Sequence, residues 1–169
     1  MGMSKQKMMI SSRSRYAAQI LFDLAQHQGE TRSLREISQD RRLPRGYVAR
    51  LMRPLQKAGL VEAIQGPAGG FRLLRQPAAI NYLEVVDAMD GRFHICQDHS
   101  DPAACPWNGA CGLVALWDRT TDRIRAIMAE ITLEDALDEY ADYCRKERLP
   151  STATRKNSRK TTKIRKKAG

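Results

Sequence analysis

The first part of the chain contains three segments in which apolar residues recur every three or four positions. This spacing places them on one face of an α-helix, so helices are predicted within residues 14–29, 33–43 and 43–60. Ser33 followed three residues later by Glu36 is typical of a capping box, which would start the second helix. The apolar residues that define the three faces are Ala17, Ile20, Leu21, Leu24, Ala25, Leu34, Ile37, Val48, Leu51, Met52 and Leu55.

The pattern changes at residues 60–74, which read LVEAIQGPAGGFRLL. Two short apolar runs flank a Gly-rich turn, which is typical of a β-hairpin. Gly69 and Gly70 are expected to adopt positive φ in that turn. Three helices followed by a hairpin predict a winged helix-turn-helix, a mainly α fold with a small β-hairpin that places its third helix in the major groove of DNA.

A further short helix is predicted within residues 80–91, and a much longer helical region from Leu113 to Leu149, which contains no Gly or Pro. "TLED" at residues 132–135 resembles a new helix start, so a break is expected near Thr132. The apolar stripe of this region could cover an intramolecular core or form a dimer interface. Its members are Leu113, Leu116, Trp117, Thr120, Ile124, Ile127, Met128 and Ile131.

Charge divides the chain into three parts. Residues 1–75 contain 14 Lys and Arg against 5 Asp and Glu, whereas residues 76–150 contain 7 against 14. Residues 151–169 contain 8 basic residues and no acidic ones, with few apolar residues, so this tail is predicted to be disordered and to add nonspecific DNA affinity. The basic first part is expected to bind double-stranded DNA, since Lys and Arg at phosphates release counterions.

Several side chains of the predicted DNA-binding domain could contact DNA. Arg45, Tyr47 and Arg50 lie near the start of the third helix, where base edges would be reached, and arginine can bond guanine with two hydrogen bonds. Residues ahead of the first helix, including Arg15, could touch phosphate. The complete predicted set is Ser12, Arg13, Tyr16, Ser33, Arg45, Tyr47, Arg50, Gln65, Gly69, Gly70 and Arg72.

Three cysteines, Cys96, Cys105 and Cys111, lie in a segment rich in Asp, Pro, Gly and Ala. The chain shows neither a signal peptide nor an apolar run that could span a bilayer, so a cytoplasmic location without membrane contact is expected. In a reducing compartment, clustered cysteines favour a metal site or a redox sensor over a structural disulfide. The sequence shows no Gly-rich phosphate loop, catalytic triad or paired carboxylates, so no enzyme is predicted.

Together these stretches resemble the bacterial iron–sulfur winged-helix transcriptional regulators of the IscR and NsrR type. The matching motifs are "SRYAAQILFDLA", "YVARLMRPLQKAGLVEAIQGPAGGFRL", the three-cysteine loop and "LWDRTTDRIRAIMAEITLEDAL", which cover roughly residues 10–137. The resemblance implies a homodimer built on the long C-terminal helix, and operator binding through the winged domains. It also implies an iron–sulfur cluster, either 2Fe-2S or 4Fe-4S, with Cys96, Cys105 and Cys111 as ligands.

The expected organisation has three parts. A winged-helix domain covers residues 1–75. A linker helix, a cysteine loop (about 92–112) and a dimerisation helix cover 76–149, and a tail covers 150–169.

The fourth ligand of the cluster is open. Some relatives use a histidine three residues after the third cysteine, where this chain has Val114. Others use a carboxylate near the start of the first helix, where this chain has Arg15. Remaining candidates are His94, Asp98, His99, Asp101 and Cys144. Two alternatives are a zinc site that adds His99 to the three cysteines, and a metal-free thiol switch.

Overall fold

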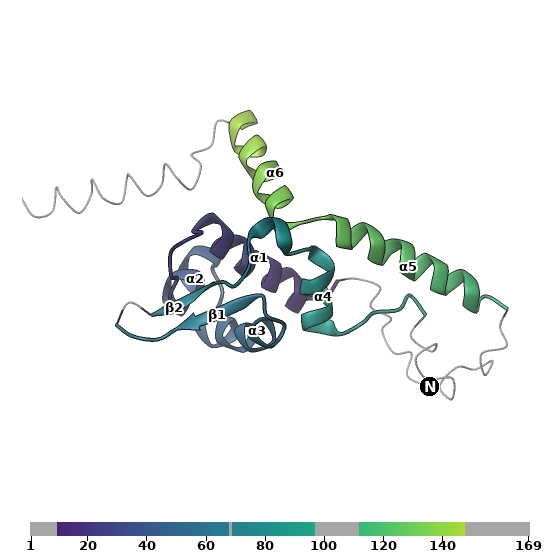
Figure 1. The fold of residues 1–169 in the computed structure, drawn as a ribbon, viewed down its shortest axis with the longest axis horizontal. Helices are drawn as coiled ribbons and strands as arrows, with labels where there is room; N and C mark the ends of the chain where they lie inside the picture. Colours follow the sequence, from purple (N-terminus) through teal and green to yellow (C-terminus); the bar gives the residue numbers. More distant parts are fainter. Residues whose placement is uncertain (1–9, 68, 97–111, 148–169) are drawn as a thin grey trace, which may run out of the picture.

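The computed structural model describes residues 10–67, 69–96 and 112–147. Its first three helices are α1 (Ser12–Gln26), α2 (Leu34–Arg41) and α3 (Arg45–Lys57). They are followed by a hairpin of β1 (Val61–Ile64) and β2 (Gly70–Leu73), as Figure 1 shows. The predicted mainly α winged helix-turn-helix fold is therefore confirmed.

Local sequence signals set several helix ends. The predicted capping box is present, because the Ser33 hydroxyl accepts a hydrogen bond from the amide of Glu36, and the Glu36 carboxylate accepts one from the amide of Ser33. Helix α3 ends at Lys57, with Ala58 as its C-cap, and the next residue, Gly59, has a φ of 68°. The amide of Leu60 then donates to the carbonyl of Leu55 at 3.0 Å, which satisfies an end carbonyl in the manner of a Schellman motif.

An isolated β-bridge joins the wing to the segment between α1 and α2. Arg32 and Phe71 exchange two backbone hydrogen bonds of 2.9 and 2.8 Å. A Cβ on Gly70 would lie 2.5 Å from the Arg32 carbonyl oxygen, so only glycine permits this approach. The expectation of positive φ at Gly70 is wrong, since the left-handed conformation occurs at Gly66 (φ 118°) instead.

One hydrophobic core holds α1, α2, α3 and the hairpin together. It continues past residue 75 into Ile80, which follows the 3-10 helix η1 (Pro77–Ala79), and into α4 (Tyr82–Asp90), which contributes side chains that are almost completely buried. Its innermost apolar members are Ala17, Ile20, Leu21, Leu24, Ile37, Val48, Leu51, Met52, Leu55, Leu60, Val61, Ile80, Val85 and Met89.

Two helices complete the described chain, α5 (Val114–Glu130) and α6 (Leu133–Lys146). The predicted break is confirmed, because Thr132 caps α6 by accepting from the amide of Asp135. Figure 1 shows α5 extending away from α1, α2 and α3, while α6 packs against α1 and η1. Among the described residues, none of the helices has both the length and the apolarity required to cross a membrane.

Candidate DNA-binding surface and cysteine segment

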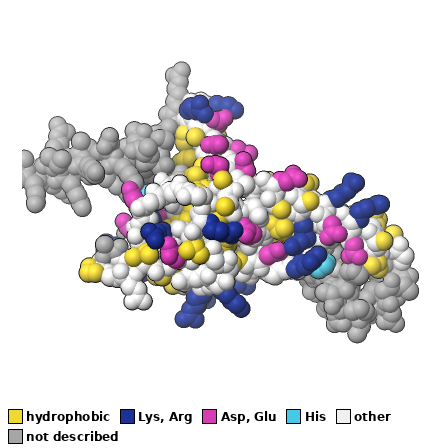
Figure 2. All heavy atoms as spheres, in the orientation of Figure 1, with side chains coloured by type: hydrophobic (Ala, Val, Ile, Leu, Met, Phe, Trp, Pro, Cys, Tyr) yellow, Lys and Arg dark blue, Asp and Glu magenta, His cyan; other side chains and the backbone are white. Residues whose placement is uncertain are grey.

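The outer face of α3 is a row of exposed arginines, Arg45, Arg50 and Arg53. None of the three has an acidic group within 4.0 Å among the residues that the structure describes. Figure 2 shows Lys and Arg side chains gathered at the lower edge, where α3 lies in Figure 1. This face therefore has positive charge available for phosphates and base edges.

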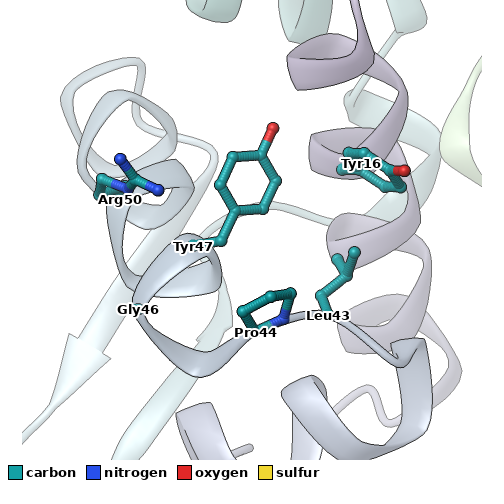
Figure 3. Close-up of a pocket in the computed structure, with 6 residues that line it drawn as sticks. All are labelled: Tyr16, Leu43, Pro44, Gly46, Tyr47 and Arg50. Atoms are coloured by element: carbon teal, nitrogen blue, oxygen red, sulfur yellow. The ribbon is translucent and has the colours of Figure 1, made fainter.

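A shallow hollow of about 500 Å³ lies between the N-terminal end of α3 and α1. Tyr16 of α1 and Tyr47 of α3 meet edge to face, with ring centroids 5.8 Å apart and planes at 87°. The guanidinium of Arg50 lies 5.5 Å from the centroid of the Tyr47 ring (Figure 3). Tyr16, Tyr47 and Arg50, which the sequence separates by up to 34 positions, are thus brought together as expected for one surface.

Leu43, Pro44 and Gly46 also line this hollow, but the sequence patterns did not single them out. Pro44 caps the start of α3, and the amides of Tyr47 and Val48 both donate to its carbonyl. A sequence signal did exist, because proline just ahead of a helix marks its first turn. The signal predicts where the helix begins, but it does not reveal that the same residues border an open hollow.

The prediction that Ser12, Arg13 and Arg15 lie ahead of the first helix is wrong. They lie in the first turn of α1, because Ser11 is the N-cap. Ser12 accepts a hydrogen bond of 3.1 Å from Arg15, while Arg13 is exposed. The N-terminal end of α1 is attached to α4 through the carboxylate of Asp90, which accepts hydrogen bonds from the hydroxyls of Ser11 at 2.7 Å and Ser14 at 2.5 Å. A carboxylate at a helix N-terminus is favourable, since the helix dipole is positive there.

The predicted wing residues have different surroundings. Gln65 is exposed near the tip, whereas Arg72 pairs with Glu62 across the two strands at 2.6 Å. A Cβ on Gly69 would lie 2.4 Å from the Ile64 carbonyl oxygen, so this glycine closes the turn. Ser33 lies at the start of α2, where its hydroxyl is occupied by the capping box. The wing is apart from the α3 hollow and forms a second portion of the predicted surface.

A buried ion-pair network, which the sequence patterns did not indicate, joins α1, α2 and the residue that pairs with the wing, Arg32. Asp23 of α1 is 1% exposed and accepts from Arg32 at 3.1 Å and from Arg41 at 3.2 Å. Arg32 also pairs with Asp40 at 2.5 Å. Burial opposes ionisation of Arg32, but its hydrogen bonds to Asp23 and Asp40 prevail and raise its pKa. The permanently charged Arg32 therefore fixes the wing strand against α1 and α2.

The cysteine segment is described only at its edges. Cys96 is a half-buried free thiol shortly after α4, whereas Cys105 and Cys111 lie outside the described residues, as do Asp98, His99, Asp101 and the tail. No group of three potential metal ligands occurs among the residues that were placed. Cys144, a candidate fourth ligand, is a free thiol 4% exposed on α6.

The segment before Cys96 is attached to α5. The amide of Ile95 donates to Thr121 at 3.1 Å, and Thr121 is buried. Asp87 of α4 and Arg125 of α5 form two parallel hydrogen bonds of 2.9 and 2.7 Å. Hydrogen bonding to Asp87 raises the pKa of Arg125, so the bridge keeps its charge. Helix α4 is thus bonded to α1 at Asp90 and to α5 at Asp87.

Residues 10–139 match the sequence model of the Rrf2 family, described as an iron-dependent transcriptional regulator. The HTH-type transcriptional regulator CymR of Bacillus subtilis is 33% identical over 80% of this chain and 93% of its own length. IscR of Photorhabdus laumondii is 32% identical over 76% of this chain and 78% of its own length.

Solved structures agree with the sequence comparison. CymR, the global cysteine regulator of B. subtilis, superposes with a TM-score of 0.64 at 29% identity, covering 79% of this chain and 98% of that one. T. potens IscR gives a TM-score of 0.61 at 27% identity, covering 81% and 91%. These relatives are regulators, which confirms that the chain is not an enzyme. The winged helix is accordingly a DNA-binding domain, and the chain belongs to the Rrf2 family of transcriptional regulators.

Proposed function

We propose that the chain is a homodimeric operator-binding regulator whose DNA affinity is set by an iron–sulfur cluster on Cys96, Cys105 and Cys111. The observation that carries the proposal concerns α5. This helix begins directly after the cysteine segment and leaves an apolar stripe uncovered. A chemical change at the cysteines could therefore alter how two copies pair, and with it the spacing of their DNA-binding helices.

The dimer is proposed from the exposure of α5. Leu113 is 48% exposed, Ile127 is 58% exposed and Ile131 is 45% exposed, although each is a large apolar side chain. Leu116 and Ile124 extend the same stripe and are also exposed. A sustained apolar stripe with heptad-like spacing is typical of a helix that pairs with another helix. A second copy supplies the matching stripe through a twofold axis.

Each copy would bind half of the operator. In this proposal Arg45, Tyr47 and Arg50 contact base edges, and Gln65 and Arg72 contact the backbone beside the wing. Ser12, Arg13 and Tyr16 contact DNA next to α3, while Ser33, Gly69 and Gly70 position the wing. Arg72 would have to share its guanidinium between Glu62 and phosphate. Two half-sites explain why the distance between copies would control affinity.

The cluster is proposed from the donor chemistry. Thiolates are soft ligands that suit iron–sulfur clusters, and Cys96 is available as a free thiol with partial exposure. Cys105 and Cys111 complete the set by their place in the sequence. When bound, the cluster would supply a redox-sensitive or ligand-sensitive centre. The surrounding chain would fix Cys96 through the Ile95–Thr121 hydrogen bond to α5.

Helix α4 offers a physical connection between the cysteines and the DNA-binding face. A displacement of α5 acts on α4 through Arg125 and Asp87, and α4 acts on the first turn of α1 through Asp90. Ser12 and Arg13 belong to that turn. Packed elements of this kind transmit small shifts because they have few alternative arrangements.

Anaerobic purification of the full chain, with absorption spectra and iron and sulfide analysis, tests the proposal. A brown protein with matching iron and sulfide, which loses both on Cys96→Ser, Cys105→Ser or Cys111→Ser, supports it. A colourless, zinc-rich protein would contradict it and favour a structural zinc site. The iron content per chain would also decide between a 2Fe-2S and a 4Fe-4S cluster.

A metal-free thiol switch is the second candidate function, and the similarity to CymR supports it. Relatives include the global cysteine regulator of B. subtilis, and one solved structure at 25% identity is an oxidized form of Staphylococcus aureus CymR. In this chain, two of the loop cysteines would form a reversible disulfide. DNA affinity that responds to a thiol oxidant in metal-free protein would support this candidate over the cluster.

A further inference from the structure

The hollow beside α3 has a composition that phosphate binding does not explain. Its walls are the rings of Tyr16 and Tyr47 and the side chains of Leu43 and Pro44, so most of its lining is apolar (Figure 3). Among the described residues that line it, Arg50 alone carries a charge. A phosphate site would instead place several cations or backbone amides around the anion.

We propose that this hollow binds the C5-methyl group of a pyrimidine next to a guanine, an inference that rests on the proposed operator contact by α3. Each base pair presents a distinct edge in the major groove, and thymine is distinguished there by its methyl group. The hollow is larger than one methyl group, so the methyl edge enters together with part of the adjoining deoxyribose. A 5-methylcytosine presents the same group at the same position.

Arg50 makes the inference specific to a two-base step. Its guanidinium lies over the Tyr47 ring, and a cation held on an aromatic face has fewer orientations available. From there it borders the same hollow that would hold the methyl group. Arginine recognises guanine by two hydrogen bonds, so a guanine beside the methylated pyrimidine is the expected neighbour.

Substitutions of two sizes at Gly46 can fill the hollow to different extents. It lines the hollow, and a Cβ added there would meet nothing within 4 Å. Gly46→Ala should therefore fold at least as well as the natural chain, because glycine is unfavourable within a helix, and an unchanged Tm of Gly46→Leu is verified before binding is measured. Leucine would occupy the space of the methyl group, whereas alanine would occupy less of it.

The experiment selects a preferred duplex from a random-sequence library with the full chain, and then replaces each thymine in turn by deoxyuridine. We expect one thymine per half-site, adjacent to a guanine, at which loss of the methyl lowers affinity about fourfold, corresponding to about 0.8 kcal/mol. Gly46→Leu should bring the thymine-to-uridine ratio close to one, and Gly46→Ala should give an intermediate ratio.

Additional duplexes test whether the methyl group itself is recognised. Their outcomes also distinguish failure of this inference from failure of the proposed operator contact. Replacing the sensitive T·A pair by C·G should weaken binding, and 5-methylcytosine there should restore part of the loss. A duplex that is selected but shows no uridine effect overturns the inference while the proposed operator contact stands. A uridine effect that Gly46→Leu leaves unchanged also overturns it. Failure to select any sequence contradicts the operator contact itself.

Discussion

Helix α1 buries its apolar face completely, whereas α5 leaves most of its apolar face in solvent. Ala17, Ile20 and Leu21 of α1 are fully buried among α2, α3 and the hairpin. Ile124 and Ile127 of α5 are exposed, and the buried side chains of α5 are Thr121 and Met128. The winged-helix part thus has a completed core within one chain, whereas the apolar stripe of α5 is exposed in a single copy.

The polar contacts of the winged-helix part are also more deeply buried than those of α5. In the winged-helix part, Asp23, Arg32 and Arg41 form a buried network that joins α1, α2 and the wing. On α5, the partly exposed bridge from Arg125 to Asp87 attaches one side of the helix to α4. Among the described residues, the winged-helix part is thus held by ion pairs in its interior, whereas α5 is held to α4 by an ion pair at the surface. In the proposed dimer, this difference would suit a rigid DNA-binding unit joined to an adjustable contact between copies.

The largest expected effect is the loss of stability when the buried ion-pair network of Asp23, Arg32 and Arg41 is broken. Asp23→Ala should lower the free energy of unfolding by about 3–5 kcal/mol, because it removes a carboxylate from two guanidinium groups in a buried site. Urea unfolding followed by circular dichroism measures it. Glu62→Ala, which breaks the exposed pair with Arg72, is the control and should change stability by less than about 1 kcal/mol.

If Asp23→Ala were no more destabilising than Glu62→Ala, the network would not be what fixes the winged-helix part. The contrast with α5 would then rest on apolar burial alone.

The next effect concerns the uncovered face. Ile127→Glu should convert the dimer to a monomer and weaken operator binding by about 100-fold or more, because simultaneous binding of two half-sites is lost. Sedimentation equilibrium and fluorescence anisotropy measure the two changes. Ala129→Glu is the matched control, since it is exposed on the same helix about 160° away from Ile127. A dimeric Ile127→Glu protein would show that the stripe is not the interface.

A smaller effect is expected at the DNA surface. Arg50→Ala should weaken specific binding by about 1–3 kcal/mol with little change in stability, because Arg50 is exposed and contacts the Tyr47 ring rather than the core. Arg119→Ala, an exposed arginine on α5, is the control. Unchanged binding by Arg50→Ala and by Arg45→Ala would mean that α3 is not the recognition helix.

The smallest effect is the pH dependence of the α2 cap. The hydrogen bond from the Ser33 amide lowers the pKa of Glu36 below its ordinary value of 4.5. A carboxylate with a lowered pKa in the folded state stabilises the fold above about pH 4.5, and this contribution is lost as the pH falls through the lowered value. Glu36→Gln should flatten the decline of Tm below about pH 4.5 by about 1–2 °C, since the group is half exposed. An unchanged decline would mean that other carboxylates account for it.

The sequence predicted the elements of the fold because their signals are local. Apolar spacing gave α1 and α3, and short polar motifs gave the start of α2 at Ser33 and the start of α6 at Thr132. The same spacing could not show whether the stripe of α5 was covered, because coverage depends on where the helix lies relative to the rest of the chain. It is for this reason that core and dimer interface remained equal alternatives.

The candidate site was predicted less completely, because its parts come from distant positions. Tyr47 and Arg50 were recognised from their place on α3, but Leu43, Pro44 and Gly46 were not recognised as the border of a hollow. The buried ion pair of Asp23 with Arg32 has no sequence pattern of its own. Gly70 was identified as necessary, but for the wrong reason, since its role is close approach to the Arg32 backbone.

Control of DNA binding by the cluster is tested by the operator affinity of one anaerobic preparation, measured by fluorescence anisotropy before and after cluster removal. The cluster-loaded dimer and the cluster-free dimer should differ in affinity by at least about tenfold, a coupling of about 1.4 kcal/mol. Cys96→Ser should bind as the cluster-free protein does. Equal affinities for all three proteins would contradict control of DNA binding by a cluster at these cysteines.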